Sequence, residues 1–388
     1  MESRNKKIRK ICIVTGSRAE YGLLKPIMVA INNHSHLDLS LIVTGTHLSE
    51  EFGYSVDEII KDGFNCLTKV YINPSEDTGF SMAESFGIGA KEIAKVLKDI
   101  HPDILLVLGD RVETLASVIS AAYMNIPIAH IHGGDSAKAG IDESARHAIT
   151  KFANIHFPAT KKSAERILKM GERKDRIFIT GAPCLDTIFS MDYLSKENVS
   201  KKFRLDLKNP FILMVQHSVT TEPEKAEEHI IESLEAVKHL KYQTIIIYPN
   251  SDSGGRRIIN QIKKYEHLHF IRTYKNLSQR DYLSLLNYAS VMIGNSSSGI
   301  IESPSFRLPV VNIGIRQEGR ERSENIINSM PEREDIISSI AKALSLNFKN
   351  KLKDSKNPYG DGKTGEKIAK ILSEIDLNNA LIQKKITY

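Results

Sequence analysis

Residues 104–111 read ILLVLGDR, an apolar run that ends in glycine, aspartate and arginine. A nearly continuous apolar run indicates a strand buried on both faces, which is typical of a parallel sheet covered by helices. Residues 112–122, which follow directly, have the apolar spacing of an amphipathic helix. The stretch therefore predicts a strand, a polar turn and a helix in succession, the repeating unit of a doubly wound α/β domain.

Similar apolar runs recur along the whole chain, with room for a helix between successive runs. In the first half they lie at residues 11–14, 39–43, 104–108, 126–129, 155–157 and 176–179. In the second half they lie at residues 211–215, 244–248, 269–271, 291–293 and 309–313. The two series predict two Rossmann-like doubly wound domains, with a ligand cleft between the carboxyl ends of their strands.

The boundary between the two series falls near residue 183. We expect an N-terminal domain of residues 1–182 and a C-terminal domain of residues 183–365. The last amphipathic segment begins near Gly365. We expect residues 366–388 to include a helix that packs back on the N-terminal domain.

Composition excludes several classes of protein. The chain has 388 residues, 41% of them hydrophobic, and a formal net charge of +6, so it is globular and long enough for two cores. No basic stripe is interleaved with aromatic residues, which argues against a nucleic-acid partner. The three cysteines are isolated, and the apolar run at residues 11–14 is too short for a signal peptide or a membrane span. We expect a soluble, cytoplasmic protein that binds no membrane.

Two polar motifs follow strands of the first series. Residues 16–22 read GSRAEYG, which presents Arg18 either at the cleft or as an ordinary surface arginine. The motif is not GxGxxG, so a dinucleotide cofactor is not indicated. In the second motif Asp110 is either an acid/base group or the cap of the next helix, and Arg111 is placed to meet a phosphate.

The second series carries the strongest ligand motif, residues 294–302, which read GNSSSGIIE. A strand end, three hydroxyl groups (Ser296, Ser297 and Ser298) and a helix start favour a diphosphate site, with Glu302 placed for ribose hydroxyls. The alternative is a serine-rich helix cap without a ligand. Further candidates at strand ends are His217, Asn250 and Arg316.

Residues 130–147 gather histidines, carboxylates and an arginine after the strand at 126–129. His130, His132 and Asp135 superficially match a zinc-ligand set. Both histidines share a face only if the strand continues through His132, and the two glycines that follow argue against that. We therefore expect no metal.

These motifs together closely resemble the UDP-N-acetylglucosamine 2-epimerase family, and its hydrolysing branch in particular. The resemblance rests on GSRAEYG at 16–22, GDR at 109–111, IDESARHAITK at 141–151 and GNSSSGIIE at 294–302. It implies a glycosyltransferase-B-like pair of domains, with the nucleotide held by the second domain and the sugar facing acids of the first. It also implies a homodimer or homotetramer, no cofactor, and conversion of UDP-N-acetylglucosamine and water to N-acetylmannosamine and UDP for sialic-acid-type sugar synthesis.

The resemblance also implies roles for individual residues. Asp110 and Asp142 match the family's acid/base carboxylates, and Arg18 and His47 match positions near the substrate. His217, Ser296, Ser297, Ser298 and Glu302 match nucleotide-binding positions, and Arg146 is a further binding residue or one that orients Asp142. Some relatives carry glutamates at the positions of His132 and Asp135. We therefore expect this chain to differ from those relatives in its second proton carrier, with His132 taking part of that role.

Other activities are compatible with parts of the pattern. The same chemistry on GDP-N-acetylglucosamine or on a UDP-diacetamido-trideoxyhexose of the legionaminic acid route, or without hydrolysis, fits the same motifs. A glycosyltransferase shares the architecture. A metallohydrolase leaves the serine loop unexplained, and a non-catalytic sensor leaves the carboxylates unexplained.

Overall fold

The computed structural model describes residues 8–50, 54–72, 79–136, 140–219, 222–249 and 254–388. It divides into two compact units. The first comprises the described residues of Met1–Ser136, Gly140–Thr187 and Tyr359–Tyr388, and the second comprises the described residues of Ile188–Pro358. No described helix is both long and apolar enough to cross a membrane.

The first unit is built on a six-stranded parallel sheet. Its strands, in spatial order, are β3 (Leu67–Lys69), β2 (Leu37–Val43), β1 (Arg9–Thr15), β4 (Ile104–Leu108), β5 (Ile128–Ile131) and β6 (Ile155–Phe157). The order 3-2-1-4-5-6 is that of a dinucleotide-binding fold, in which the order of the strands reverses between the first and fourth strands.

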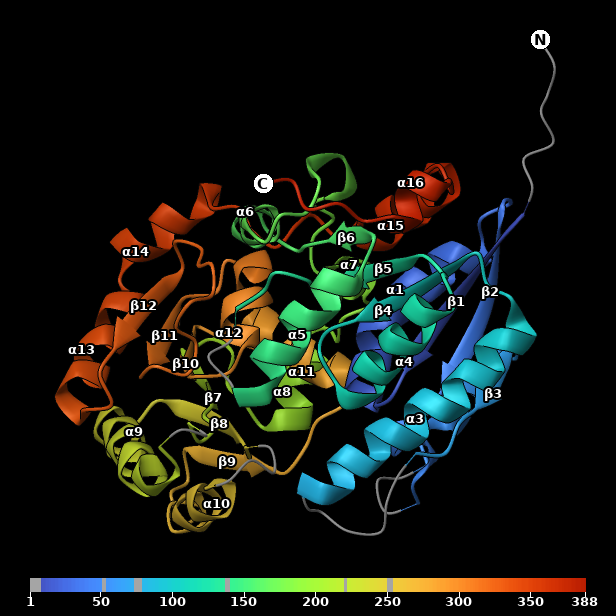
Figure 1. Ribbon diagram of the computed structural model, residues 1–388. Coiled ribbons are helices and arrows are strands. Elements are labelled where there is room, and N and C mark those ends of the chain that lie inside the picture. The colour runs from blue at the N-terminus through green and yellow to red at the C-terminus, as the bar shows by residue number, and fades with distance from the viewer. Residues whose placement is uncertain (1–7, 51–53, 73–78, 137–139, 220–221, 250–253) are drawn as a thin grey trace. The chain divides into compact units, whose positions relative to one another are not determined.

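Both faces of this sheet are buried, as the apolar runs predict. In β1, Ile11 and Ile13 face one core together with helices α1 (Arg18–Asn32) and α15 (Thr364–Glu374), which lie side by side in Figure 1. Cys12 and Val14 face the other core, with α3 (Gly79–Ile100), α4 (Val112–Tyr123) and α5 (Gly140–Phe152). Side chains alternate between the faces of a strand, so an uninterrupted apolar run fills both cores.

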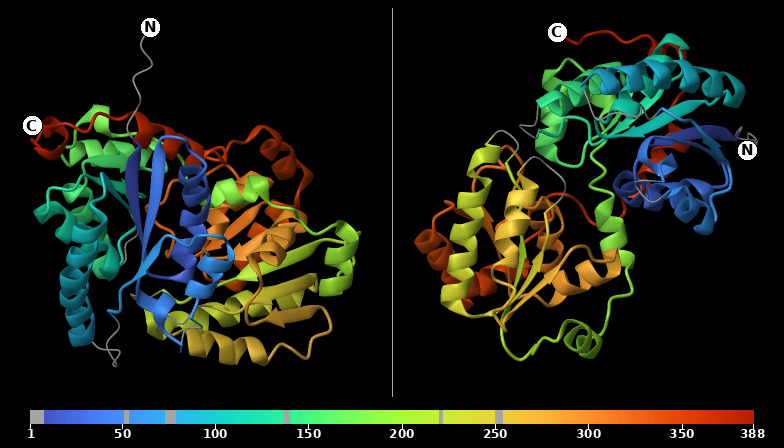
Figure 2. Two further views of the ribbon diagram at one scale, coloured as in Figure 1. Left: turned by 90° about the vertical axis from the view of Figure 1, so that its right-hand side faces the viewer. Right: turned by 90° about the horizontal axis from the view of Figure 1, so that it is seen from below.

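The second unit repeats this topology. Its parallel sheet has the order β12 (Ile326–Ser329), β11 (Val310–Ile313), β10 (Val291–Gly294), β7 (Phe211–Val215), β8 (Gln243–Ile247) and β9 (Ile271–Tyr274). Counted from β7, this is again 3-2-1-4-5-6 read from the other edge. Helices α9 (Ala226–Leu240), α10 (Gly255–Lys263) and α13 (Arg333–Leu344) cover one face, in yellow to dark orange in Figure 2. The predicted pair of Rossmann-like domains is confirmed.

Shorter helices complete the structure. They are η1 (Gly45–Leu48), α2 (Val56–Lys61), α6 (Lys161–Lys169), η2 (Lys174–Arg176), α7 (Cys184–Ser190), α8 (Lys196–Phe203), η3 (Pro223–Lys225), α11 (Gln279–Tyr288), α12 (Ser298–Ile301), η4 (Ser303–Phe306), α14 (Leu346–Lys351), η5 (Leu352–Asp354) and α16 (Asn379–Ile382). The η helices are of the 3-10 type.

Four elements differ from the sequence-based expectation. The edge strands β3 and β12 were not predicted, because each is short and half polar. The expected strand at 176–179 is only a single bridge between His156 and Ile177. The expected last helix is broken into α15 and α16, and Asn378 caps the second piece.

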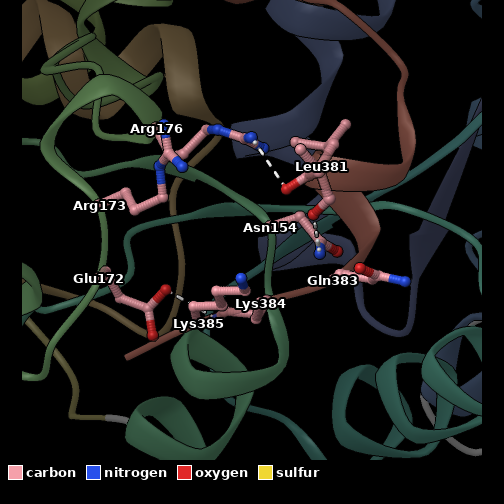
Figure 3. Close-up of a pocket in the computed structure, with 9 residues that line it drawn as sticks. Asn154, Glu172, Arg173, Arg176, Leu381, Gln383, Lys384 and Lys385 are labelled. Carbon is pink, nitrogen blue, oxygen red and sulfur yellow. Dashed lines mark hydrogen bonds and ion pairs between the residues drawn. The ribbon is translucent and has the colours of Figure 1, made fainter. Parts of the chain in front are cut away.

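The C-terminal tail is tied to the first unit by polar contacts (Figure 3). The Lys384 ammonium donates to the carbonyls of Lys151 and Ala153 at 2.5 and 2.6 Å, near the C-terminus of α5, where a cation is favourable. It also pairs with Glu172 at 2.7 Å, and Asn154 Nδ2 donates to the Leu381 carbonyl at 2.8 Å. A small pocket lies at this seam, lined by Asn154, Glu172, Arg173, Arg176, Ala380, Leu381, Gln383, Lys384 and Lys385.

Candidate active site

The first candidate region is the carboxyl edge of the first sheet, at the neighbouring ends of β1 and β4. Ser17 follows β1 and caps α1, accepting a hydrogen bond from the amide of Glu20 at 3.3 Å. The Glu20 carboxylate reaches back to the amide of Gly16 at 2.6 Å, so the pair forms a variant of the capping box. This turn leaves Arg18 exposed, with its Nε 3.0 Å from the Glu58 carboxylate of α2.

Asp110 follows β4 and does not cap the next helix. The cap position of α4 is Arg111, and no side chain accepts from the helix there. The Asp110 carboxylate instead pairs with the Arg146 guanidinium of α5. Arg146 also donates to the Asp135 carbonyl at 3.2 Å and to Glu143 at 3.4 Å. The capping hypothesis for Asp110 is therefore wrong, and Arg146 joins the loops that follow β4 and β5.

Asp142 lies in the first turn of α5, the helix that also carries Arg146. The residue is exposed, yet the surrounding protein partly desolvates its carboxyl group. This desolvation raises the pKa of Asp142, and the positive charge of Arg111 opposes the rise. A carboxylate with a raised pKa is better matched to proton transfer near neutrality than an ordinary aspartate.

His132 and Asp135 form a hydrogen-bonded pair just after β5. His132 Nδ1 lies 2.8 Å from Asp135 Oδ2, and Ser163 Oγ donates to the other carboxylate oxygen at 2.6 Å. Because a carboxylate only accepts, Nδ1 carries the proton of the neutral ring and Nε2 is left as a base. The backbone of His132 is left-handed, with φ of 62°, which turns its ring away from the direction of the strand.

The two histidines of the HxH motif lie in different environments. β5 ends at Ile131, as the glycines predict, and His130 is fully buried. His130 Nε2 donates to the Gly109 carbonyl at 2.8 Å, and burial lowers the pKa of His130 to about 3. No cluster of three or more His, Cys, Asp or Glu side chains among the described residues is arranged to hold a metal ion.

His47 is also buried rather than exposed at the edge of the sheet. Its ring nitrogens lie 3.0 Å from the Thr15 hydroxyl and 2.8 Å from the Ser55 hydroxyl. Burial, with the charge of Arg111, lowers the pKa of His47 to about 4. In this structure His47 therefore supports the loops after β1 and β2 as a neutral side chain.

The second candidate region is the carboxyl edge of the second sheet, where β7 and β10 diverge. Asn295 is buried, and its amide oxygen accepts from the His217 amide at 2.7 Å while its amide nitrogen donates to the His217 carbonyl at 2.9 Å. Gly294 has φ of 118°, and a Cβ there would overlap the Val215 carbonyl. The ends of β7 and β10 are therefore held together. This positions His217 beside the loop that carries Ser296, Ser297 and Ser298, which we call the serine loop.

The serine loop is held by a chain of hydroxyl groups. Tyr282 of α11 donates to Ser298 Oγ at 2.6 Å, and Ser298 donates in turn to the Glu302 carboxylate. Burial raises the pKa of Glu302, and the Ser298 hydrogen bond opposes the rise. The expected helix start is present as α12, which comprises Ser298–Ile301, and Glu302 lies between it and η4.

Sequence reasoning missed several residues that shape this edge. Arg316 Nη1 and Gln317 Nε2 donate to the Asn295 carbonyl at 3.2 and 2.9 Å, so the predicted Arg316 reaches the loop together with an unpredicted neighbour. Tyr282 and Asn295 were also missed. Asn295 lies in the motif at residues 294–302. Its partner is His217, which only the pairing of β10 with β7 brings close to it. The predicted Asn250 lies outside the described residues.

The structure thus brings the predicted residues together in two separate groups. Within the first unit, Asp110, Arg111, His132, Asp135, Asp142 and Arg146 lie on the loops after β4 and β5 or on the helices that follow. Within the second, His217, Ser296, Ser297, Ser298, Glu302 and Arg316 lie after β7, β10 and β11. Ligands of open α/β sheets bind at such switch points.

Comparisons with known proteins agree with the motifs. Residues 29–373 match the model of a family described as UDP-N-acetylglucosamine 2-epimerase. A UDP-N,N'-diacetylbacillosamine 2-epimerase (hydrolyzing) of Legionella pneumophila is 37% identical over 98% of this chain and 100% of that protein.

A second relative and a solved structure extend the comparison. A UDP-N-acetylglucosamine 2-epimerase of Neisseria meningitidis is 32% identical over 97% of this chain and 98% of that protein. The crystal structure of UDP-GlcNAc 2-epimerase from Neisseria meningitidis bound to UDP-GlcNAc superposes with a TM-score of 0.81. It covers 94% of this chain and 99% of that one at 20% identity, which is a likeness of fold.

Proposed function

Because this chain belongs to the UDP-N-acetylglucosamine 2-epimerase family, we propose that it is a hydrolysing 2-epimerase of a nucleotide-linked 2-acetamido sugar. A base removes the proton at C2, and the bond between C1 and the diphosphate oxygen breaks to give a 2-acetamidoglucal and the nucleoside diphosphate. Addition of water at C1, with protonation of C2 from the opposite face, then releases the inverted free sugar.

The observation that carries this proposal is the set of proton-transferring groups on one edge of the first sheet. Inversion at C2 needs one group to take a proton and another to give one. Asp142, with its raised pKa, is suited to one of these tasks. His132, oriented by the Asp135 carboxylate, is suited to the other, because its Nε2 can both accept and donate. Asp110, held by Arg146, is the third member of the set.

The departing diphosphate needs positive charge and hydrogen-bond donors rather than acids. Arginines at the candidate edges include Arg111 and Arg18 in the first unit and Arg316 in the second. The hydroxyl and amide groups of Ser296 and Ser297 are suited to phosphate oxygens, and the Glu302 carboxylate to ribose hydroxyls. We propose that the second unit binds the nucleotide and that the first performs the proton transfers.

The choice of sugar is a finer question. The relative at 37% identity is named for UDP-N,N'-diacetylbacillosamine, a diacetamido-trideoxyhexose, and the one at 32% for UDP-N-acetylglucosamine. We propose the diacetamido sugar as the first candidate substrate and UDP-N-acetylglucosamine as the second. This reverses the order of the two candidates that the motifs alone suggested.

A side-by-side assay tests the function and its substrate. The purified protein is incubated with UDP-N,N'-diacetylbacillosamine, UDP-N-acetylglucosamine and GDP-N-acetylglucosamine, and the products are identified by NMR. The proposal predicts free 2-epimerised sugar and nucleoside diphosphate, with the highest kcat/KM for the diacetamido substrate. Epimerised sugar still bound to UDP would indicate a non-hydrolysing epimerase, and transfer of the sugar to an acceptor would indicate a glycosyltransferase.

A further inference from the structure

Glu113 is a buried carboxylate that no part of the proposed reaction uses. It lies in the first turn of α4, where an acidic residue is often found simply because it favours the helix dipole. Such residues are usually exposed, however, whereas Glu113 is only 1% exposed. Burial of a charged side chain is costly unless it is paired, so its contacts need an explanation.

The contacts of Glu113 join three strand ends of the first sheet. Its Oε1 accepts from Arg111 Nε at 2.8 Å, just after β4. A Cβ added to Gly16, after β1, or to Gly45, after β2, would overlap the same carboxylate. Both glycines therefore leave space for the Glu113 side chain, which extends from α4 to the ends of two further strands.

One oxygen of this carboxylate remains available. Among the described residues, no hydrogen-bond partner reaches Glu113 Oε2, although that atom is buried.

The other buried carboxyl group beside it, Glu20, binds the Gly16 amide. Burial raises the pKa of Glu20 to about 7, and the charge of Glu113 adds to this rise. Glu20 is therefore neutral in mildly acidic solution.

Arg111 links this cluster to the proposed acid/base site. Burial lowers the pKa of Arg111, while the carboxylates of Glu113, Glu20 and Asp142 raise it and prevail. The charge of Arg111 in turn opposes the rise in the pKa of Asp142 and adds to the lowering of the pKa of His47. Arg111 is therefore the charged group through which Glu113 can act on Asp142.

We propose that Glu113 is a positioning residue, which holds Arg111 beside Asp142 and offsets part of its positive charge. The role of Asp142 in proton transfer rests on the proposed function, but the electrostatic link itself does not. Without Glu113, the full charge of Arg111 favours the ionised form of Asp142. With it, Asp142 keeps a proton affinity suited to transfer near neutrality.

The test measures the titration of Asp142 directly. Protein labelled with ¹³C at the aspartate carboxyl carbon is titrated by NMR, and Asp142→Asn identifies the resonance. Glu113→Gln keeps an acceptor oxygen for Arg111 but removes the charge. We expect it to lower the pKa of Asp142 by about half a unit or more. Glu92→Gln makes the same change at an exposed ion pair on α3 and serves as the control with an unchanged titration.

A second variant keeps the test decisive if Glu113→Gln does not fold. Arg111→Gln removes the positive charge, so it should raise the pKa of Asp142. An unchanged Asp142 titration in folded Glu113→Gln overturns the proposal, because a merely structural Glu113 would not change it. An unchanged titration in Arg111→Gln overturns it as well, because Glu113 then has no charge through which to act. In an active enzyme the acid limb of kcat/KM should move to lower pH in Glu113→Gln. Absence of turnover in the wild type would refute the proposed function and leave the titration as the test of Glu113.

Discussion

The two units have the same strand order but opposite chemistry at the carboxyl edges of their sheets. In the first, ion pairs and titratable groups meet, among them Asp110 with Arg146 and His132 with Asp135. In the second, neutral groups dominate: the Asn295 amide clamps His217, and Tyr282 orders the serine loop. The same fold thus supports two kinds of site, and the side chains after the strands decide which.

From this difference we propose that the first edge performs the chemistry and the second binds the nucleotide. Groups that change their protonation state suit proton transfer. Hydroxyl and amide groups, which keep one state over the working pH range, suit recognition of a nucleotide. Changes in the first unit should therefore affect kcat and its pH dependence, and changes in the second should affect KM. Each prediction below tests this division.

The largest effect is expected from the carboxylates of the first unit. Asp142→Asn and Asp110→Asn should each lower kcat by a factor of about a hundred to ten thousand, or roughly 3–5 kcal/mol, as for loss of an acid or base. UDP affinity, measured by calorimetry, should change little. A variant that loses affinity for UDP but keeps its kcat would contradict the assignment of catalysis to the first unit and of binding to the second.

Acid should weaken the first unit before the second. His47, His130 and His156 are fully buried in the first unit. Burial lowers the pKa to about 4 for His47 and to about 3 for His130. It also lowers the pKa of His156, although Glu172 opposes that shift. Because the unfolded chain binds protons more readily, their stabilising contribution is complete above pH 6.5 and falls as pH decreases. At pH 5.5 the loss should be about 1.4 kcal/mol each for His47 and His130, with a further loss from His156. Protonation of Glu20, whose pKa burial raises to about 7, should return about 2 kcal/mol of it.

Hydrogen exchange at pH 7.5 and pH 5.5 measures this loss in each unit separately. Amides of β1 and β4 should lose protection at pH 5.5 by far more than those of β7 and β10, after correction for intrinsic exchange rates. His156→Gln should reduce the pH dependence, since one of the histidines whose pKa is lowered by burial is gone. Equal loss in both sheets would contradict the assignment of these histidines as neutral.

The His132 and Asp135 pair should have an intermediate effect on turnover. His132→Gln should lower kcat by about ten- to a hundredfold, or about 1–3 kcal/mol, since it keeps the polar contacts but cannot carry a proton. Asp135→Asn should have a smaller effect of the same kind, because the histidine remains but is less well oriented. If His132→Gln raises KM without lowering kcat, His132 is a binding residue and Asp110 becomes the second proton carrier.

The smallest effect is expected at the serine loop. Ser297→Ala and Glu302→Gln each remove one proposed contact to the nucleotide, so KM should rise by about two- to tenfold, as for loss of about one hydrogen bond. Turnover at saturating substrate should stay within a factor of two. A large fall in kcat at unchanged KM would show that the second unit takes part in the chemistry.

Much of the fold could be predicted because the decisive strands are buried on both faces. The runs at 104–108 and 211–215 each predict a central strand of a parallel sheet, and both form one. The edge strands β3 and β12 could not be predicted, because a strand covered on fewer sides does not need an apolar sequence. Their pairing depends on the neighbouring strands and not on their own residues.

The candidate site was predictable at the level of residue types but not of partners. The motifs place Asp110 and Asp142 after a strand and at a helix start, where the structure has them. The bond between Asp110 and Arg146 joins residues 36 positions apart and follows only from the packing of α5 beside β4 and β5. The burial of Glu113 could not be predicted, because it depends on Gly16 and Gly45, which are distant from it in the sequence.

The central claim is that the first unit removes and returns a proton at C2 of a nucleotide-linked sugar. Turnover in deuterated water, with NMR analysis of the released sugar, tests it most directly. The account predicts one solvent deuterium at C2 of the inverted, free sugar. Released sugar with its original proton at C2 would contradict the proposed proton abstraction and elimination.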